Sequence, residues 1–146
     1  MTTLQKTVMI QATPAEIDAV ALAGERLPEW YAGIQEAKSD GVYPEVGGVI
    51  EAVYKAAGIS FKIKIISLEL DRGHSIKLKM DGMITGTNEW VYTPLAGGTE
   101  VTATLDYEMP GGGLGQMVNK LVVEKMNAEN LEKSLNNLKR VVESGG

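Results

Sequence analysis

The chain has 146 residues, of which 44% are hydrophobic and 23% are charged, a balance typical of one globular domain. Its formal net charge of −5 disfavours nonspecific binding to nucleic acid or to an anionic membrane surface. Because the chain contains no cysteine, disulfides, thiolate zinc sites and cysteine nucleophiles are excluded. We therefore expect a single domain spanning residues 1–146, with no nucleic-acid partner.

The N-terminal residues lack the basic and apolar regions of a secretion signal, and no apolar run is long enough to span a bilayer. We therefore expect a cytoplasmic protein that does not insert stably into a membrane. His74 is the single histidine and stands in a charged turn. Without a second histidine or any cysteine, a transition-metal site is not expected, and we expect no cofactor.

A strand followed by a helix is predicted at the start of the chain. Alternating apolar residues indicate the strand over Leu4–Gln11. The helix begins with Thr13 as N-cap, Pro14 in the first turn and Glu16 as the carboxylate of a capping box, and it would run to about Ala23.

A second short helix is predicted over Glu25–Tyr31, and most of the chain after it is typical of strands joined by short links. Short links imply antiparallel neighbours in a meander. The predicted strands are Ile34–Asp40, Val49–Ala57, Ile59–Leu70, Ile76–Met80, Thr85–Thr93 and Val101–Met109.

The longest predicted strand contains a change of face. Apolar residues alternate up to Ile65, and then the apolar face moves to Ile66, Leu68 and Leu70. A change of face inside one strand indicates a β-bulge, because an extra residue reverses the alternation. We therefore expect this strand to be strongly bent.

A long amphipathic helix is predicted after the glycine-rich segment Pro110–Gly113, because neither glycine nor proline occurs between Gly115 and Ser144. At about 40 Å it would be long enough to cover a curved sheet. Its main apolar stripe comprises Met117, Leu121, Ala128, Leu131, Leu135, Leu138 and Val142.

The predicted fold class is α+β. A strongly curved, seven-stranded antiparallel sheet would wrap around the long C-terminal helix, with two short helices between the first and second strands. A sheet that is apolar on one face needs such a cover, since the short helices alone are too small for it.

Four short strings reinforce this prediction: 12–17 (ATPAEI), 27–30 (LPEW), 46–48 (VGG) and 98–102 (GTEVT). In this order and spacing they resemble the polyketide cyclase/dehydrase-like (SRPBCC) family of the START-like superfamily. The resemblance covers nearly the whole chain and implies the helix-grip fold. Because that superfamily includes carriers, cyclases and hydrolytic enzymes, the fold alone does not decide the function.

The residues predicted to face the helix are mostly apolar, with a few polar groups among them. The alternation alone is compatible with a packed core, whereas the resemblance favours a cavity, because helix-grip sheets usually curve around one. The predicted ligand-binding residues are Trp30, Tyr54, Phe61, Ile63, Leu78, Met80, Asn88, Trp90, Tyr92, Tyr107, Met109, Met117 and Leu121.

Asn88 is a polar residue of this set, and the sequence leaves two interpretations of it. A buried amide needs hydrogen-bond partners, since leaving it unpaired costs on the order of 1–3 kcal/mol. Asn88 would either bind a ligand carbonyl or hydroxyl, or pair with Tyr54, Tyr107 or the backbone.

Glu124 is the one candidate catalytic residue, because it lies within the apolar stripe of the predicted helix. A carboxylate directed into an apolar pocket would have a raised pKa and would serve as a general acid or base. Alternatively, the first half of the helix overhangs the rim of the sheet and leaves Glu124 in water beside Lys120.

Two further surfaces are predicted. Val118, Val122 and Met126 form a second apolar row on the helix, which would cap a pocket mouth or contact another subunit, so a homodimer through this row is a hypothesis. The outward basic residues Lys62, Lys64, Lys77 and Lys79 are interpreted as a solvated face.

The expected function is binding of a small hydrophobic ligand, lipid- or polyketide-like, between the curved sheet and the C-terminal helix. Two alternatives stay open. The first is a cyclase/dehydratase-type enzyme that acts on such a ligand, with Glu124, Asn88 or a tyrosine transferring protons. The second is a protein–protein interaction module. Binding ranks first because the predicted pocket contains a single candidate carboxylate.

Overall fold

The computed structural model describes residues 2–56, 58–108 and 120–145. The predicted order of elements is confirmed. The elements are β1 (Thr2–Ile10), α1 (Pro14–Ala21), η1 (Gly24–Arg26), α2 (Leu27–Trp30), β2 (Ile34–Ser39), β3 (Val49–Ala56), β4 (Ile59–Asp71), β5 (Ser75–Gly82), β6 (Thr85–Leu95), β7 (Gly98–Glu108) and α4 (Lys120–Glu143).

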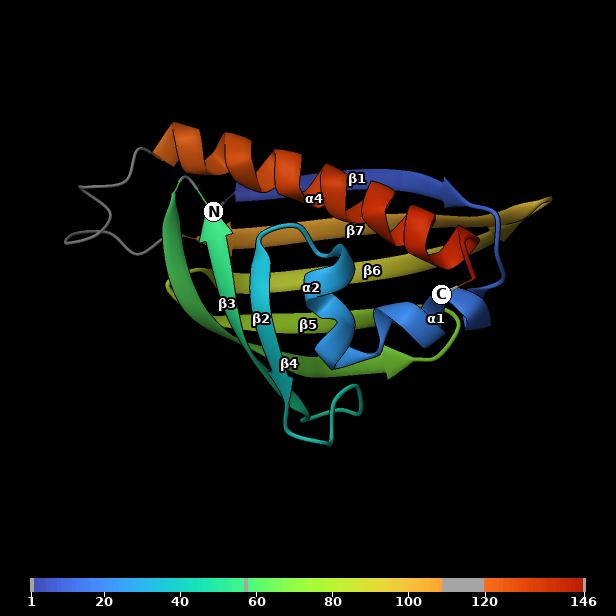
Figure 1. Ribbon diagram of the computed structural model, residues 1–146, viewed down its shortest axis with the longest axis horizontal. Coiled ribbons are helices and arrows are strands. Elements are labelled where there is room, and N and C mark those ends of the chain that lie inside the picture. Colours follow the sequence, from blue (N-terminus) through green and yellow to red (C-terminus); the bar gives the residue numbers. More distant parts are fainter. Residues whose placement is uncertain (1, 57, 109–119, 146) are drawn as a thin grey trace.

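The strands form one antiparallel sheet in the order β1-β7-β6-β5-β4-β3-β2. From β2 to β7 each strand pairs with the next one in the chain, and β1 is added at the edge beside β7. Figure 1 shows the sheet curling so that β2 and β3 run across the direction of β5 and β6, with α4 along β1. The predicted fold class, a curved seven-stranded sheet with a long C-terminal helix, is therefore confirmed.

The predicted bulge in β4 is present, but its effect on the side chains differs from the expectation. The register shifts between Ser67 and Glu69, which leaves Leu68 without a partner on β5. Ser67 continues the inward alternation at 1% exposure, whereas Leu68 is 38% exposed. Leu70 is the residue beyond the bulge that packs against the core. The inward position of Leu68 was wrong because the bulged residue itself is displaced from the pleat.

Local sequence explains the start of α1. Thr13 Oγ1 accepts a hydrogen bond from the backbone N–H of Glu16 at 3.2 Å, and Glu16 Oε1 accepts one from the backbone N–H of Thr13 at 3.0 Å. This pair is the predicted capping box, and it satisfies backbone donors that a helix start otherwise leaves unpaired. The first turn places Ile17 in the core at 0% exposure.

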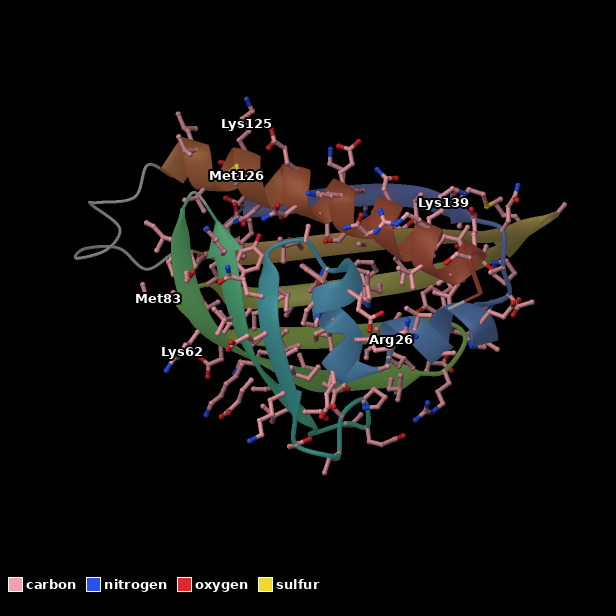
Figure 2. All side chains as sticks on the ribbon, in the orientation of Figure 1. Arg26, Lys62, Met83, Lys125, Met126 and Lys139 are labelled. Atoms are coloured by element: carbon pink, nitrogen blue, oxygen red, sulfur yellow. The ribbon has the colours of Figure 1, made fainter. Side chains whose placement is uncertain are left out.

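The C-terminal half of α4 is fixed to β1, α1 and α2. Leu131, Leu135 and Leu138 are at most 1% exposed, as the predicted stripe requires. Lys139 Nζ donates to the Met9 carbonyl at 2.8 Å; Figure 2 shows this side chain beside β1. This half of the helix is therefore a structural support.

The N-terminal half of α4 is rotated relative to the expectation. Leu121 is 76% exposed, while Val123 and Asn127 are 1% and 2% exposed. The predicted inward position of Leu121 was therefore wrong, and Met117 lies outside the described residues. Apolar spacing gives the width of a stripe, but packing against the rest of the fold determines which edge of that stripe is buried. Here Asn127 accepts a hydrogen bond from the Tyr54 hydroxyl of β3. In the described part of the chain, no helix has the length and apolar composition needed to cross a bilayer.

Candidate ligand cavity

A cavity of about 50 Å³ lies against the inner face of the curved sheet. Its walls come from α2, the strands β2 to β7, the end of α1, one residue of α4 and three residues between elements, namely Tyr31, Tyr43 and Ile84. Most of the side chains that line it are aliphatic or aromatic. The predicted site residues that line it are Trp30, Tyr54, Ile63, Leu78, Met80, Asn88, Trp90 and Tyr92.

Of the other five residues of the predicted set, three lie elsewhere and two fall outside the described residues. Phe61 and Tyr107 are buried at 3% exposure, but they belong to the core around the cavity and do not line it. Leu121 is on the surface. Met109 and Met117 lie outside the described residues, as does the glycine-rich segment that precedes α4.

The sequence analysis missed several lining residues, of which Tyr31, Tyr43 and Asn127 carry polar groups. Tyr31 follows Trp30 at the end of α2, so its place beside a predicted site residue was the available signal. Tyr43 comes from the loop between β2 and β3, where no periodicity places a side chain. Asn127 was missed because it falls beside the predicted apolar stripe of α4.

Three aromatic rings form one wall of the cavity. The ring centroids of Trp30 and Trp90 are 5.4 Å apart at an interplanar angle of 87°, an edge-to-face contact. Tyr31 lies 5.5 Å from Trp30 and 6.0 Å from Trp90. Contacts of this kind contribute about 0.5–1.5 kcal/mol each beyond the burial of apolar area. The short helix α2 is thereby held against β6.

Asn88 holds this aromatic wall in place. Its Oδ1 accepts from the Trp90 indole at 2.8 Å and from the Tyr31 hydroxyl at 3.1 Å. Its Nδ2 donates to the Thr104 carbonyl at 3.1 Å. Of its two open roles, the geometry therefore matches pairing within the protein, although Tyr31 and Trp90 take the place expected for Tyr54 and Tyr107.

A second polar group connects β3 with α4. Asn130 Nδ2 donates to the Tyr54 hydroxyl at 3.0 Å, and that hydroxyl donates to Asn127 Oδ1 at 2.7 Å. Burial raises the pKa of Tyr54 to about 12, so the hydroxyl keeps its proton at neutral pH. Through this chain of hydrogen bonds the orientation of the Asn127 amide is fixed.

Three buried polar atoms have no hydrogen-bond partner among the described residues: Trp30 Nε1, Tyr92 Oη and Asn127 Nδ2. For Tyr92, burial is the main cause of a raised pKa, and the nearby Asp18 carboxylate adds to it. The hydroxyl of Tyr92 therefore lies within reach of a charged neighbour. Trp30 and Asn127 both line the cavity, and each has an N–H donor without a partner among the described residues.

Glu124 does not line the cavity. Its side chain is half-buried on α4, and its charge is a minor cause, after burial, of the raised pKa of Tyr107. Of the second apolar row, Met126 packs partly against the core and Val122 is 46% exposed, while Val118 lies outside the described residues. A catalytic role for Glu124 and a homodimer through this row stay predictions.

The outward lysines are interleaved with acidic residues and do not form a continuous basic patch. Antiparallel pairing places Lys38 opposite Glu51, Glu51 opposite Lys64, and Lys64 opposite Asp81. Figure 2 shows Lys62 projecting from the same outer face. Within the described ranges, no three histidine or acidic side chains are grouped closely enough to hold a metal ion.

Comparison with known proteins supports this geometry at the level of family and fold. Residues 1–143 match the sequence model of a family described as polyketide cyclase/dehydrase and lipid transport. A sequence search of curated proteins finds no match.

Three solved structures share the fold across nearly their whole length. The protein TTHA0849 from Thermus thermophilus has a TM-score of 0.83 at 23% identity, with 99% of each chain covered. The Zhui aromatase/cyclase from Streptomyces sp. R1128 has a TM-score of 0.82 at 16% identity, covering 99% of this chain and 98% of its own. A START superfamily protein from Mycobacterium smegmatis has a TM-score of 0.79 at 20% identity, with 97% of each chain covered.

Proposed function

Because the chain belongs to the polyketide cyclase/dehydrase and lipid transport family, we propose that it binds a small apolar molecule in the cavity beneath α2. The observation that carries the proposal is an internal cavity lined almost entirely by apolar and aromatic side chains. Such a lining with a few placed polar groups is the usual composition of a small-molecule site.

The size of the cavity limits the ligand. About 50 Å³ is well below the roughly 300–1,000 Å³ of sites for drug-sized ligands. It is also below the roughly 150 Å³ of an engineered apolar cavity that binds benzene, so even a single ring requires the lining to move apart. A lipid- or polyketide-sized molecule requires α2 to move away from the sheet. We therefore place a compact aromatic or alicyclic molecule first.

The cyclase-type alternative ranks second for a chemical reason. An enzyme of that kind needs an acid or base in contact with its substrate. Among the described residues that line the cavity, the ionisable groups are tyrosines, and burial raises the pKa of Tyr31, Tyr43 and Tyr54. Binding needs no such group.

A titration with isopropylbenzene tests the proposal. Trp30 and Trp90 are the two tryptophans of the chain and both line the cavity, so we expect their fluorescence to change on binding. A ligand at one hundred times its Kd should also stabilise the protein by about 2.7 kcal/mol, measurable as a rise in Tm.

Two variants show whether the cavity is the binding site. Leu78→Phe fills the cavity from β5, and we expect it to weaken binding at least about fivefold, because a ligand would then have to overpack the site, at a cost of about 1–3 kcal/mol. Lys79→Phe adds the same ring to the opposite, exposed face of β5 and should leave the Kd unchanged. Equal affinities for both variants would place the ligand elsewhere, and no binding by the wild type would refute the proposal.

A further inference from the structure

Two residues that line the cavity have hydrogen-bond donors without a partner among the described residues. Asn127 and Trp30 are 2% and 3% exposed, and each has an N–H without a partner in the described part of the chain. A buried donor left unpaired costs about 1–3 kcal/mol, so folded proteins rarely retain one. Two such donors at one cavity indicate that something that binds there accepts hydrogen bonds.

The orientation of the Asn127 amide is determined by its neighbours. The Tyr54 hydroxyl accepts from Asn130 at 3.0 Å, so its own proton is available for Asn127 Oδ1 at 2.7 Å. The carbonyl side of the amide is thus occupied within the protein. These bonds leave the NH₂ side of the amide unused, and Asn127 is the one residue of α4 among the described residues that line the cavity.

Tyr107 is the internal competitor for this NH₂ group. Burial raises the pKa of Tyr107, and a hydrogen-bonding interaction from the Asn127 side chain opposes that shift. The Asn127 NH₂ group is therefore turned partly toward the Tyr107 hydroxyl, but no partner of Asn127 Nδ2 among the described side chains has the geometry of a full hydrogen bond. A ligand acceptor competes with this weak contact.

The charge of the lining restricts the ligand further. Among the described lining residues there is no aspartate, glutamate, histidine, lysine or arginine. An anionic ligand would lose its hydration without gaining a cationic partner, which is costly in an apolar site. Glu124, one turn before Asn127 on α4, would add repulsion. A neutral acceptor, such as a ketone, ester or amide oxygen, avoids both costs.

We propose that Asn127 is the polar anchor of the cavity, where its Nδ2 donates to a neutral acceptor oxygen on an otherwise apolar ligand. This inference rests on the proposed function and adds to it the residue and the ligand group that determine selectivity. The bond is made by a rigidly held amide, so it discriminates between ligands of equal size and shape.

Three probes with the same number of non-hydrogen atoms test the anchor: acetophenone, isopropylbenzene and benzoate. We expect acetophenone to bind about fivefold more tightly than isopropylbenzene, because one net hydrogen bond contributes about 0.5–1.5 kcal/mol. Benzoate should bind more weakly than acetophenone. In ¹⁵N-labelled protein, acetophenone should move the Asn127 side-chain amide signals downfield, and isopropylbenzene should not.

Variants separate the anchor from the cavity. In Asn127→Leu the preference for acetophenone should disappear while isopropylbenzene still binds. Because this change leaves the Tyr54 hydroxyl without its acceptor, Tyr54→Phe/Asn127→Leu serves as a second variant in which both partners are apolar. Asn136→Leu makes the same replacement on the exposed face of α4 and should keep the preference.

The outcomes distinguish the two proposals. If none of the three probes binds, the proposed function fails, and the anchor fails with it. If isopropylbenzene binds as tightly as acetophenone, or if Asn127→Leu keeps the preference, the anchor is overturned while the cavity stands. Benzoate binding as tightly as acetophenone would overturn the requirement for a neutral ligand.

Discussion

Gly33 shows how one residue positions the polar groups of the cavity. It has a φ of +97°, a conformation that side chains with a Cβ rarely adopt. A Cβ at this position would lie 2.4 Å from Tyr54 Cε1 and 3.1 Å from Asn130 Nδ2. The absence of a side chain at Gly33 therefore allows the Tyr54 ring to reach Asn127 and Asn130.

We predict that Gly33→Ala destabilises the protein more than Gly97→Ala. Both glycines have a positive φ, but a Cβ at Gly97 would meet nothing within 4 Å. Backbone strain costs on the order of 1–3 kcal/mol in both variants, and Gly33→Ala adds a clash with the Tyr54 ring. Urea unfolding measures the difference, and equal losses would show that the ring shifts without cost.

Asn88 is a second residue whose neighbours determine its role at the cavity. Its amide is buried among aromatic residues of the cavity, so its position alone suggests contact with a ligand. Its bonds to Tyr31, Trp90 and Thr104 use its acceptor and one of its two N–H donors. The geometry gives it a positioning role, and Asn127 has the more available donor.

The two helices nearest the cavity have different roles. The four residues of α2 (Leu27–Trp30) include Leu27 and Trp30, both of which line it, whereas α4 contributes Asn127. The longer helix supports the shorter one: Asn137 Nδ2 donates to the Trp30 carbonyl at 3.1 Å. Ser134 Oγ accepts from the backbone N–H of Ala32 at 2.8 Å. The cover of the cavity is therefore α2, held in place by α4.

We predict that Ser134→Ala loosens this cover. The Ala32 N–H loses its acceptor, and Ser134 is 0% exposed, so the free energy of unfolding should fall by about 1–2 kcal/mol. Hydrogen exchange at residues 27–34 should accelerate. Ser144→Ala is the control, because Ser144 also bonds a backbone carbonyl of α4 but is exposed. An unchanged exchange rate in Ser134→Ala would refute the role of α4 as support.

Two hydrogen-bonded carboxylates hold connections between elements. Asp40 accepts backbone N–H bonds from Val42 at 2.8 Å, Tyr43 at 3.1 Å and Val49 at 3.0 Å. Near the C-terminus, Glu143 accepts the backbone N–H of Gln11 at 2.8 Å and so joins α4 to the residue after β1. Backbone hydrogen bonds, foremost those from Val42 to Asp40 and from Gln11 to Glu143, lower the pKa of both carboxyl groups.

These shifts predict a loss of stability in acid. The pKa of Asp40 is lower in the folded state than in the unfolded state, where it is about 3.9, so the unfolded chain takes up its proton first as the pH falls. The stabilisation is present above about pH 4 and is lost below it. Asp40→Ala should therefore unfold at lower urea than the wild type at pH 7, and the gap should narrow at pH 3.

The exposed Asp81 provides the control for this measurement, since it stands on the outer face of β5 beside the lysines of β4. Asp81→Ala should shift the urea midpoint less than Asp40→Ala at pH 7. If the gap between Asp40→Ala and the wild type is the same at pH 7 and pH 3, the bonds to Val42, Tyr43 and Val49 are not what stabilises the loop.

The predictions made from sequence succeeded where the cause is local. The capping box of Thr13 and Glu16 needs residues three apart, and it forms as expected. The predictions failed where one residue depends on distant contacts. Leu121 and Asn127 lie about 120° apart on a helical wheel, on either side of the middle of the predicted stripe, and packing against other elements decided that the side with Asn127 is buried. Likewise, the bulge in β4 was visible in the alternation, but its placement at Leu68 follows from pairing with β5.

The order of elements, the antiparallel sheet and most of its inward side chains follow from the order of amino acids alone, because alternation and helical spacing are properties of neighbouring residues. Three-dimensional packing sets which short helix covers the cavity, how far α4 is rotated, and which amide donor has no partner among the described residues. Those features depend on hydrogen bonds between residues far apart in the chain, such as Tyr54 with Asn127, and no local pattern encodes them.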